Sequence, residues 1–371
     1  MITFNKVDIQ GKEFAYMEDA IENGVVSGDG KFSKKCNSLF MNELRIKKSL
    51  LTPSCTHALE MAAILLDIKP GDEVIVPSFT FVSTINAFVL RGAEPVFIDI
   101  RPDTLNIDEN QIEGLITPNT KAIIVVHYAG VGCEMNQILN IANKFDISVI
   151  EDNAHGLFGK YKNKFLGTFG NFATQSFHET KNFTCGEGGA LFINDQKYVE
   201  RAEIIREKGT NRSKFFRGEI DKYTWVDIGS SYLLSDLSAA FLYGQLEQRY
   251  LIQEKRKKIW NQYYSLLVDW AENREIRLPY IPDHCEHTYH MFYLIMPSMD
   301  LRTKFINHLN KNGYQAVFHY LPLHLSPKGI TLTNRETHCP VTESVSDRIV
   351  RLPFFTSLDT QQINFEIFYK F

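Results

Sequence analysis

From residue 72 onward the sequence alternates short apolar runs with stretches of helical periodicity, and this alternation constrains the fold more than any other feature. The apolar runs are rich in valine and isoleucine and lie at 74–76, 96–98, 122–126 and 147–150. Helical spacing of apolar residues follows at 81–90, 107–116 and 135–145. Short β-rich runs that alternate with helices predict an α/β protein with a mostly parallel sheet covered on both faces.

Polar segments follow three of these apolar runs, at 77–81, at 127–130 and at Asp152. In open parallel sheets, ligands bind beyond the carboxyl ends of the strands. We therefore expect these segments to converge on one site.

The rest of the chain predicts further elements of both kinds. Helices are expected at 12–23, from residue 55, at 197–208 and at 299–311, and strands at 172–177, 190–193 and 291–296. One long helix over 235–267 is expected to bridge two domains, because the segments after it read as a small α+β unit. We therefore predict a large domain at 1–248 and a small C-terminal domain at 249–371.

Composition excludes several classes of function. The 371 residues are 44% hydrophobic and 23% charged, with a net charge of -4 and no basic stripe, which indicates a globular protein that does not bind nucleic acid. Six dispersed cysteines form no C-x-x-C pair, so neither a zinc site nor a disulfide framework is expected. No apolar run reaches the roughly 20 residues of a membrane span, and the start lacks a signal-peptide pattern. These features indicate a cytoplasmic protein.

The stretch 151–189 carries the most distinctive chemistry. Asp152 ends a buried strand, where a lone carboxylate is costly unless it has a partner or caps a helix. Lys181 follows 29 residues later, close to Ser176 and to a glycine cluster at 186–189. A single lysine is usually a solvated side chain. Together, however, the acid, the amine and the small residues suit a cofactor that carries a phosphate and is held through an imine.

Other candidate residues have structural alternatives. Ser54, Cys55 and Thr56 precede a helical pattern, where they can cap the helix or bind a phosphate. Phe79 or Phe81 can cover a ring, or simply pack in the core. The glycine-rich segment 24–30 lacks Walker spacing and is typical of a surface turn. No histidine pair has zinc-binding spacing, so we predict no metal.

These motifs resemble the DegT/DnrJ/StrS family of sugar aminotransferases, which are pyridoxal phosphate (PLP) enzymes. The family's acid, lysine and glycine motifs are matched at 151–155 (EDNAH), 176–181 (SFHETK) and 186–189 (GEGG). Further similar segments lie at 54–56 (SCT), 77–81 (PSFTF), 319–324 (HYLPLH) and 352–353 (LP). The resemblance covers essentially the whole chain and implies the aspartate-aminotransferase-like fold, termed fold type I.

The resemblance also implies roles for individual residues. Lys181 would hold PLP and move protons, and Asp152 would pair with the ring nitrogen. Residues implied in binding the cofactor are Ser54, Cys55, Thr56, Phe81, Asp152, His155, Ser176, Lys181 and Ser231. Residues implied in binding substrate are Ser27, Asp29, Gly30, His319, Tyr320 and His324. Ser231 stands where the wider family has an asparagine that reaches the partner subunit's phosphate in a homodimer, and Cys55 stands where it usually has glycine.

Within the family, the stretches 51–56, 204–216, 221–225 and 229–233 are similar to members that aminate dTDP-4-keto-6-deoxyglucose at carbon 4. Those members use L-glutamate and give the galactose configuration, for cell-surface polysaccharides such as enterobacterial common antigen or O-antigen lipopolysaccharide. Alternatives are the glucose isomer, a 3-amino sugar, a UDP-linked substrate and a non-catalytic PLP-binding regulator. A PLP-dependent sugar dehydratase is disfavoured, because those relatives carry histidine in place of Lys181.

Overall fold

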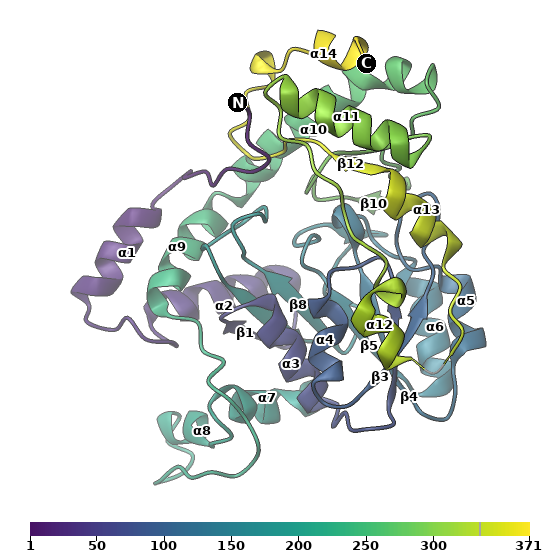
Figure 1. Cartoon of the computed structure of the whole chain (residues 1–371). Coiled ribbons are helices and arrows are strands. Elements are labelled where there is room, and N and C mark those ends of the chain that lie inside the picture. Colours follow the sequence, from purple (N-terminus) through teal and green to yellow (C-terminus); the bar gives the residue numbers. More distant parts are fainter. Residues whose placement is uncertain (334) are drawn as a thin grey trace.

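The computed structural model describes residues 1–333 and 335–371 and is organised around a seven-stranded sheet (Figure 1). The strands lie in the order β1-β9-β8-β5-β4-β2-β3. Their bounds are β1 Lys48–Thr52, β2 Glu73–Pro77, β3 Glu94–Ile98, β4 Thr120–Val126, β5 Ser148–Asp152, β8 Phe172–Ser176 and β9 Gly189–Ile193. Strands β3, β2, β4, β5 and β8 are parallel, and β9 pairs antiparallel with both β8 and the edge strand β1. The predicted α/β fold is confirmed.

Helices cover both faces of this sheet because alternate strand residues point to opposite sides. Val74 and Val76 of β2 pack with helices α3 (Cys55–Leu65) and α4 (Ser83–Val89). Ile75 faces the other way, toward α5 (Glu109–Leu115) and α6 (Met135–Phe145). Burial on both faces explains why these strands read as continuous apolar runs.

Two elements near the N-terminus were not anticipated, and one expected element is different. Helix α2 (Lys31–Leu44) and strand β1 lie in a part of the chain for which the sequence predicted no helix or strand. The single long helix predicted over 235–267 is wrong, because the chain forms α9 (Asp236–Glu247) and α10 (Arg249–Glu272). The break is at Gln248, whose φ of -93° and ψ of 12° end one helix and begin the next. The domain division near this point stays a prediction.

A second apolar cluster gathers residues from α10 onward, and we call this part the C-terminal lobe (residues 249–371). It contains β11 (Tyr293–Ile295), α11 (Met299–Lys311), β12 (Ile349–Arg351) and α14 (Glu366–Tyr369). The N-terminus joins the same lobe, since Ile2 bridges to Tyr314 and the Phe354 N–H donates to the Phe4 carbonyl at 3.1 Å. The chain then leads to α1 (Glu13–Glu22), which lies beside α9 (Figure 1).

The C-terminal lobe is attached at several points, two at the carboxyl edge of the large sheet and one in a separate small sheet. Asp99, directly after β3, accepts hydrogen bonds from the Val341 and Thr342 N–H groups at 2.9 and 2.8 Å and so caps α13 (Pro340–Arg348). The Leu323 N–H donates to the Ser78 carbonyl at 3.0 Å. Strand β10 (Cys285–Glu286) pairs with β6 (Lys160–Tyr161), which pairs with β7 (Lys164–Phe165).

The remaining elements are short and connect the larger ones. They are η1 (Tyr128–Gly130), η2 (Gln196–Tyr198), α7 (Val199–Arg206), α8 (Arg212–Phe216), η3 (Leu323–Leu325), α12 (Pro327–Leu332) and η4 (Thr360–Gln362). Among the helices in the described part of the chain, none combines the length and the apolar character that crossing a bilayer requires.

Candidate active site

A cavity of about 760 Å³ opens beyond the carboxyl ends of β4 and β5, and the C-terminal lobe forms its opposite wall. The structure brings together ten of the residues predicted from the sequence. They are Ser54, Cys55, Thr56, Phe81, Asp152, His155, Ser176, Lys181, His319 and Tyr320. The expected convergence of segment 77–81 and Asp152 is confirmed, because Thr80, Phe81 and Asp152 line this cavity, whereas residues 127–130 do not.

Asp152 is the last residue of β5 and is buried. Its Oδ2 accepts a hydrogen bond from the Thr84 hydroxyl at 2.8 Å, and its Oδ1 accepts one from the Ala154 N–H at 3.2 Å. Burial raises the pKa of the carboxyl, and the hydrogen bond from Thr84 is the largest opposing effect. No described helix begins here, so the carboxylate is not a helix cap. It is held in place and still faces the cavity.

Lys181 lies in the loop after β8, where its backbone N–H donates to the His178 carbonyl at 2.9 Å. Removal of its amine from bulk water lowers the pKa to about 8, although the neighbouring Cys55 and Asp152 act in the opposite direction. A substantial fraction of the amine is therefore neutral near physiological pH. Neutral amines are nucleophiles and proton acceptors, so Lys181 is suited to both tasks.

The N-terminus of α3 forms another wall of the cavity. Ser54 caps this helix by accepting a hydrogen bond from the His57 N–H at 3.2 Å, while Cys55 and Thr56 begin it. Gly189 of β9 approaches this turn so closely that a Cβ atom would lie 2.3 Å from the Ser54 carbonyl carbon. The helix N-terminus, its hydroxyl groups and the close glycine together suit an anionic group such as phosphate.

The two phenylalanines after β2 have different positions. Phe79 is 1% exposed and packs against Tyr128 and Tyr320 at ring distances of 5.2 and 5.6 Å. Phe81 is 56% exposed and lines the cavity. Of the two residues proposed to cover a ring, Phe81 is the one at the cavity.

Three histidine rings gather on the inner wall. His155 stacks on His290 with ring centroids 4.2 Å apart, and His319 lies 6.4 Å from His155. Burial lowers the pKa of all three, so these rings are neutral at pH 7. His290 and His319 have partners in Asn182 and Tyr128, whereas the buried Nδ1 of His155 has none among the described residues.

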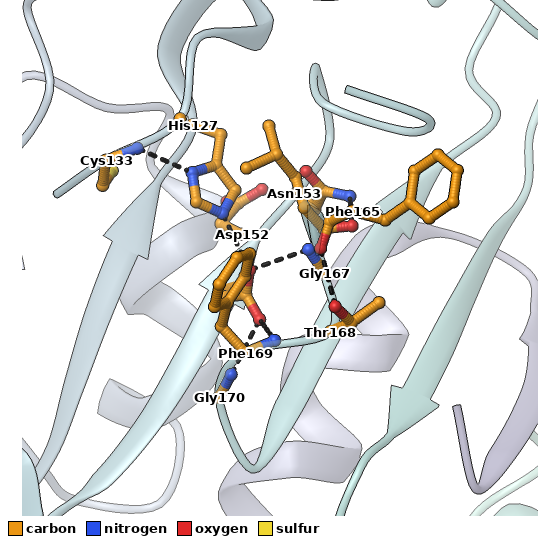
Figure 2. Close-up of polar contacts among 12 residues, drawn as sticks. His127, Cys133, Asp152, Asn153, Phe165, Gly167, Thr168, Phe169 and Gly170 are labelled. Carbon is orange, nitrogen blue, oxygen red and sulfur yellow. Dashed lines mark hydrogen bonds and ion pairs between the residues drawn. The ribbon is translucent and has the colours of Figure 1, made fainter. Parts of the chain in front are cut away.

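A buried network beneath the cavity fixes the end of β5 (Figure 2). The carboxylate of Glu151, beside Asp152, accepts hydrogen bonds from the Gly167, Phe169 and Gly170 N–H groups at 2.7 to 2.8 Å. His127 Nε2 lies 2.9 Å from the same carboxylate, and its Nδ1 accepts from the Cys133 N–H. Because Nδ1 is an acceptor, the proton of the neutral ring is on Nε2 and is donated to Glu151.

Three other predicted residues lie in a separate cavity of about 940 Å³, which Ser27, Asp29 and Ser231 line. Asp29 forms an ion pair with Arg206 at 2.5 Å in this cavity. Gly30 is the N-cap residue of α2, where a Cβ atom would collide with Asp236. Within one chain these residues do not reach Lys181.

His324 is also outside the main cavity. Its Nδ1 lies 2.6 Å from the Ser78 hydroxyl and its Nε2 lies 3.1 Å from Glu343. Both ring nitrogens are therefore occupied by contacts that join η3 and α13 to the end of β2.

The cavity residues fit the cofactor that the resemblance implies. A phosphate matches the N-terminus of α3, an acid is available for a ring nitrogen, and an amine of lowered pKa is available for an aldehyde. The unpartnered Nδ1 of His155 leaves a hydrogen-bonding atom for a polar substituent. Each polar part of PLP therefore has a matching group in the cavity, and this match supports PLP binding.

The sequence did not single out Thr84, His290 or Arg351, which also line the cavity. Thr84 and His290 have no motif of their own, and their importance depends on contacts with Asp152 and His155 that form only in the fold. Arg351 directly precedes the Leu352-Pro353 motif, and only this position in the sequence could have indicated that it lines the cavity.

Comparison with known proteins identifies the family. The model of the DegT/DnrJ/EryC1/StrS aminotransferase family matches residues 7–365. The uncharacterized protein MJ1066 of Methanocaldococcus jannaschii is 36% identical, over 90% of this chain and 88% of its own length. GDP-perosamine synthase of Escherichia coli O157:H7 is 30% identical, over 96% of this chain and 93% of its own length.

A solved structure agrees over the whole chain. The protein Spr1654 of Streptococcus pneumoniae in its PMP form superposes with a TM-score of 0.91 at 26% identity and covers 100% of this chain and 98% of its own. The same protein is known in a PLP form. Aminotransferases of this family are PLP-dependent. The sequence, the fold and the cavity agree, and the chain belongs to the DegT/DnrJ/EryC1/StrS family of PLP-dependent aminotransferases.

Proposed function

We propose that this aminotransferase transfers the amino group of L-glutamate to the keto carbon of a nucleotide-linked 6-deoxy sugar in the cytoplasm. The single observation that supports this most strongly is the cavity that Asp152, the N-terminus of α3 and Lys181 line together. The names of the relatives support a sugar substrate, because two curated relatives at 30% identity are GDP-perosamine synthases.

Different residues of the cavity have different roles in such a reaction. When bound, PLP supplies an aldehyde that can take up an amino group and a ring that withdraws electrons. Asp152 would hold the protonated ring nitrogen of the cofactor, and the hydrogen bonds from Thr84 and Ala154 keep the carboxylate in position. Lys181 Nζ, with a pKa of about 8, can take a proton from one carbon and deliver it to another at neutral pH.

A homodimer with shared sites is part of this proposal. Apolar side chains of the segment 215–228 are exposed, including Phe216 at 68% and Trp225 at 76%. This segment projects from the body of the protein around α8 (Figure 1). Exposed large apolar groups of this kind mark interaction surfaces. In a dimer, Ser231 and the segment 27–30 of one subunit would complete the cavity of the other.

For the sugar itself, the first candidate is dTDP-4-keto-6-deoxyglucose, giving dTDP-4-amino-4,6-dideoxygalactose for cell-surface polysaccharides such as lipopolysaccharide O-antigen. The similar stretches at 51–56, 204–216 and 229–233 support it. The second candidate is a GDP-linked keto sugar, which the two GDP-perosamine synthases favour. The two candidates differ in the nucleotide, so one assay separates them.

The test incubates the purified protein with PLP, L-glutamate and either nucleotide keto sugar, and identifies products by mass spectrometry and proton NMR. A product in which an amine replaces the ketone is expected with the dTDP sugar, with a small coupling between H3 and H4 that indicates an axial amine. A large coupling would indicate the glucose isomer. A reaction with the GDP sugar alone would overturn the first candidate in favour of the second.

A substitution of Asp152 tests the proposed role of the acid. Asp152→Asn keeps the side-chain shape and the acceptor for one of its two donors, but removes the charge that stabilises a protonated ring. An ion pair of this kind is worth roughly 4 kcal/mol at an effective dielectric near 20 before desolvation is subtracted. We expect kcat to fall by roughly 100-fold or more. PLP binding and the circular dichroism spectrum should be retained, and a variant with near wild-type kcat would contradict the role.

A further inference from the structure

Arg351 stands out in the cavity because its positive charge has no counter-charge. Its Nε atom is buried without a hydrogen-bond partner, and in the described part of the chain no carboxylate lies within 4 Å of its guanidinium. The buried Arg256, by contrast, donates to the Tyr289 and His290 carbonyls and to Thr356. The Arg351 guanidinium lies over the Phe4 ring, whose centroid is 4.7 Å away.

Strand β12 directs the Arg351 side chain toward the cavity. Arg351 ends β12 opposite Tyr293 of β11, and its backbone pairs with Val317. Val350 and Leu352 point into the apolar core of the C-terminal lobe. Since side chains alternate along a strand, Arg351 points to the other side, where it lines the cavity.

The groups around the guanidinium are neutral or cationic. Tyr128 and Tyr320 interact with it electrostatically, and burial raises the pKa of both phenols, so they are uncharged at pH 7. Its other charged or titratable neighbours on the cavity walls are His155, His290, His319 and Lys181. Arg351 is half-buried, with its Nε out of contact with solvent, and a cation in such surroundings is costly unless an anion binds beside it.

The chemistry of the two substrates decides which anion this is. In an amino acid the carboxylate is attached to the carbon that reacts, so it must enter the cavity together with the amine. In a nucleotide sugar the diphosphate is on carbon 1, away from a keto group at carbon 4. The phosphate of PLP is matched by the N-terminus of α3, on another wall. Guanidinium groups bind carboxylates through paired hydrogen bonds.

We propose that Arg351 binds a carboxylate of the amino-acid donor and thereby selects an amino acid in the half-reaction that loads the amino group. This inference rests on the proposed function. It makes Arg351 a donor-specificity residue on the C-terminal lobe, with no contact to the sugar in the other half-reaction.

The experiment compares the two half-reactions of the PLP-loaded enzyme by the change in cofactor absorbance. The variants are Arg351→Met, which keeps the apolar stem, and Arg351→Lys, which keeps the charge but loses the paired geometry. In R351M we expect kcat/KM for L-glutamate to fall roughly 10- to 100-fold, as expected for loss of a charged hydrogen bond. The reverse half-reaction with the amino sugar should be reduced much less than the half-reaction with L-glutamate, and R351K should be intermediate.

Two further readouts do not depend on turnover. Binding of glutarate, a dicarboxylate without an amine, should weaken to a similar degree in R351M when measured by calorimetry. The melting temperature of R351M should equal or exceed that of the wild type, because an uncompensated buried charge has been removed. A lower melting temperature, unchanged glutarate binding or an equal loss in both half-reactions would overturn the proposal.

L-Alanine separates the two carboxylates of glutamate. If R351M also loses reactivity with L-alanine, Arg351 binds the α-carboxylate; if only L-glutamate is affected, it binds the γ-carboxylate, and both results support the proposal. A wild type that converts no keto sugar would overturn the proposed sugar substrate, while the glutamate half-reaction and glutarate binding would still test Arg351.

Discussion

Replacing Lys181 by alanine is expected to abolish turnover, with kcat at least roughly 1,000-fold below the wild type. The amine lies in the cavity with Asp152, and its pKa of about 8 suits it to accept and return a proton near neutral pH. No other amine lines this cavity among the residues the structure describes, so no neighbouring side chain can replace it. Single-turnover measurement of cofactor absorbance after addition of L-glutamate gives the rate.

The matched control is Lys181→Arg, which keeps a positive charge that does not deprotonate in proteins. If proton transfer is the role of Lys181, K181R is as inactive as K181A.

The stability of K181A provides a second control. The pKa of Lys181 in the folded protein is below the ordinary value of 10.5, so the folded state binds this proton more weakly than the unfolded state does. The free energy of unfolding of the wild type therefore rises as the pH increases from about 8 to 10.5. K181A should therefore not melt below the wild type at pH 7. A variant that retains substantial transaminase activity contradicts the mechanism.

Glu151→Gln is expected to give the largest loss of stability, a decrease of about 3 kcal/mol in the free energy of unfolding. The carboxylate accepts three backbone hydrogen bonds and lies beside the Nε2 proton of His127 (Figure 2). An amide has the same shape but presents N–H groups to at least one of these donors, which then lacks an acceptor in a buried site. Urea unfolding followed by circular dichroism measures the change.

A matched exposed position provides the comparison. Glu286 forms an ion pair with Lys160 at 3.0 Å, and its side chain is 62% exposed. Glu286→Gln should change stability by no more than about 0.5 kcal/mol, because exposed ion pairs are screened by solvent. Equal effects of the two substitutions would show that the network at Glu151 does not stabilise the end of β5.

The sequence predicted the parallel core and the convergence of Asp152 with Lys181 because both depend on local patterns. Strands buried on both faces require continuous apolar runs, and such runs are visible without a structure. The break at Gln248 was not visible, because apolar spacing continues across it and no glycine or proline marks it. Strand β1 was also missed, since its assignment depends on pairing with β9, more than 130 residues later.

The same distinction applies to the site. Residues within motifs, such as Ser54 and Ser176, were predicted and line the cavity. His324 was grouped with His319 by its motif, yet the 3₁₀ turn η3 directs it to Ser78 and Glu343 instead. Arg351 could not be selected from the sequence, because the missing counter-charge that distinguishes it is a property of its three-dimensional surroundings.

The several attachments of the C-terminal lobe have a mechanical consequence. A lobe joined by one linker can swing as a hinged flap, but this lobe is also held through β10 on β6, through α13 at Asp99 and through η3 at Ser78. Attachments at separate points oppose rotation of the lobe as one body. The walls that carry Arg351 and Lys181 therefore keep their spacing like opposite sides of a braced frame. Crystals of the protein should consequently tolerate soaking with donor and sugar in turn, without the cracking that accompanies lobe closure.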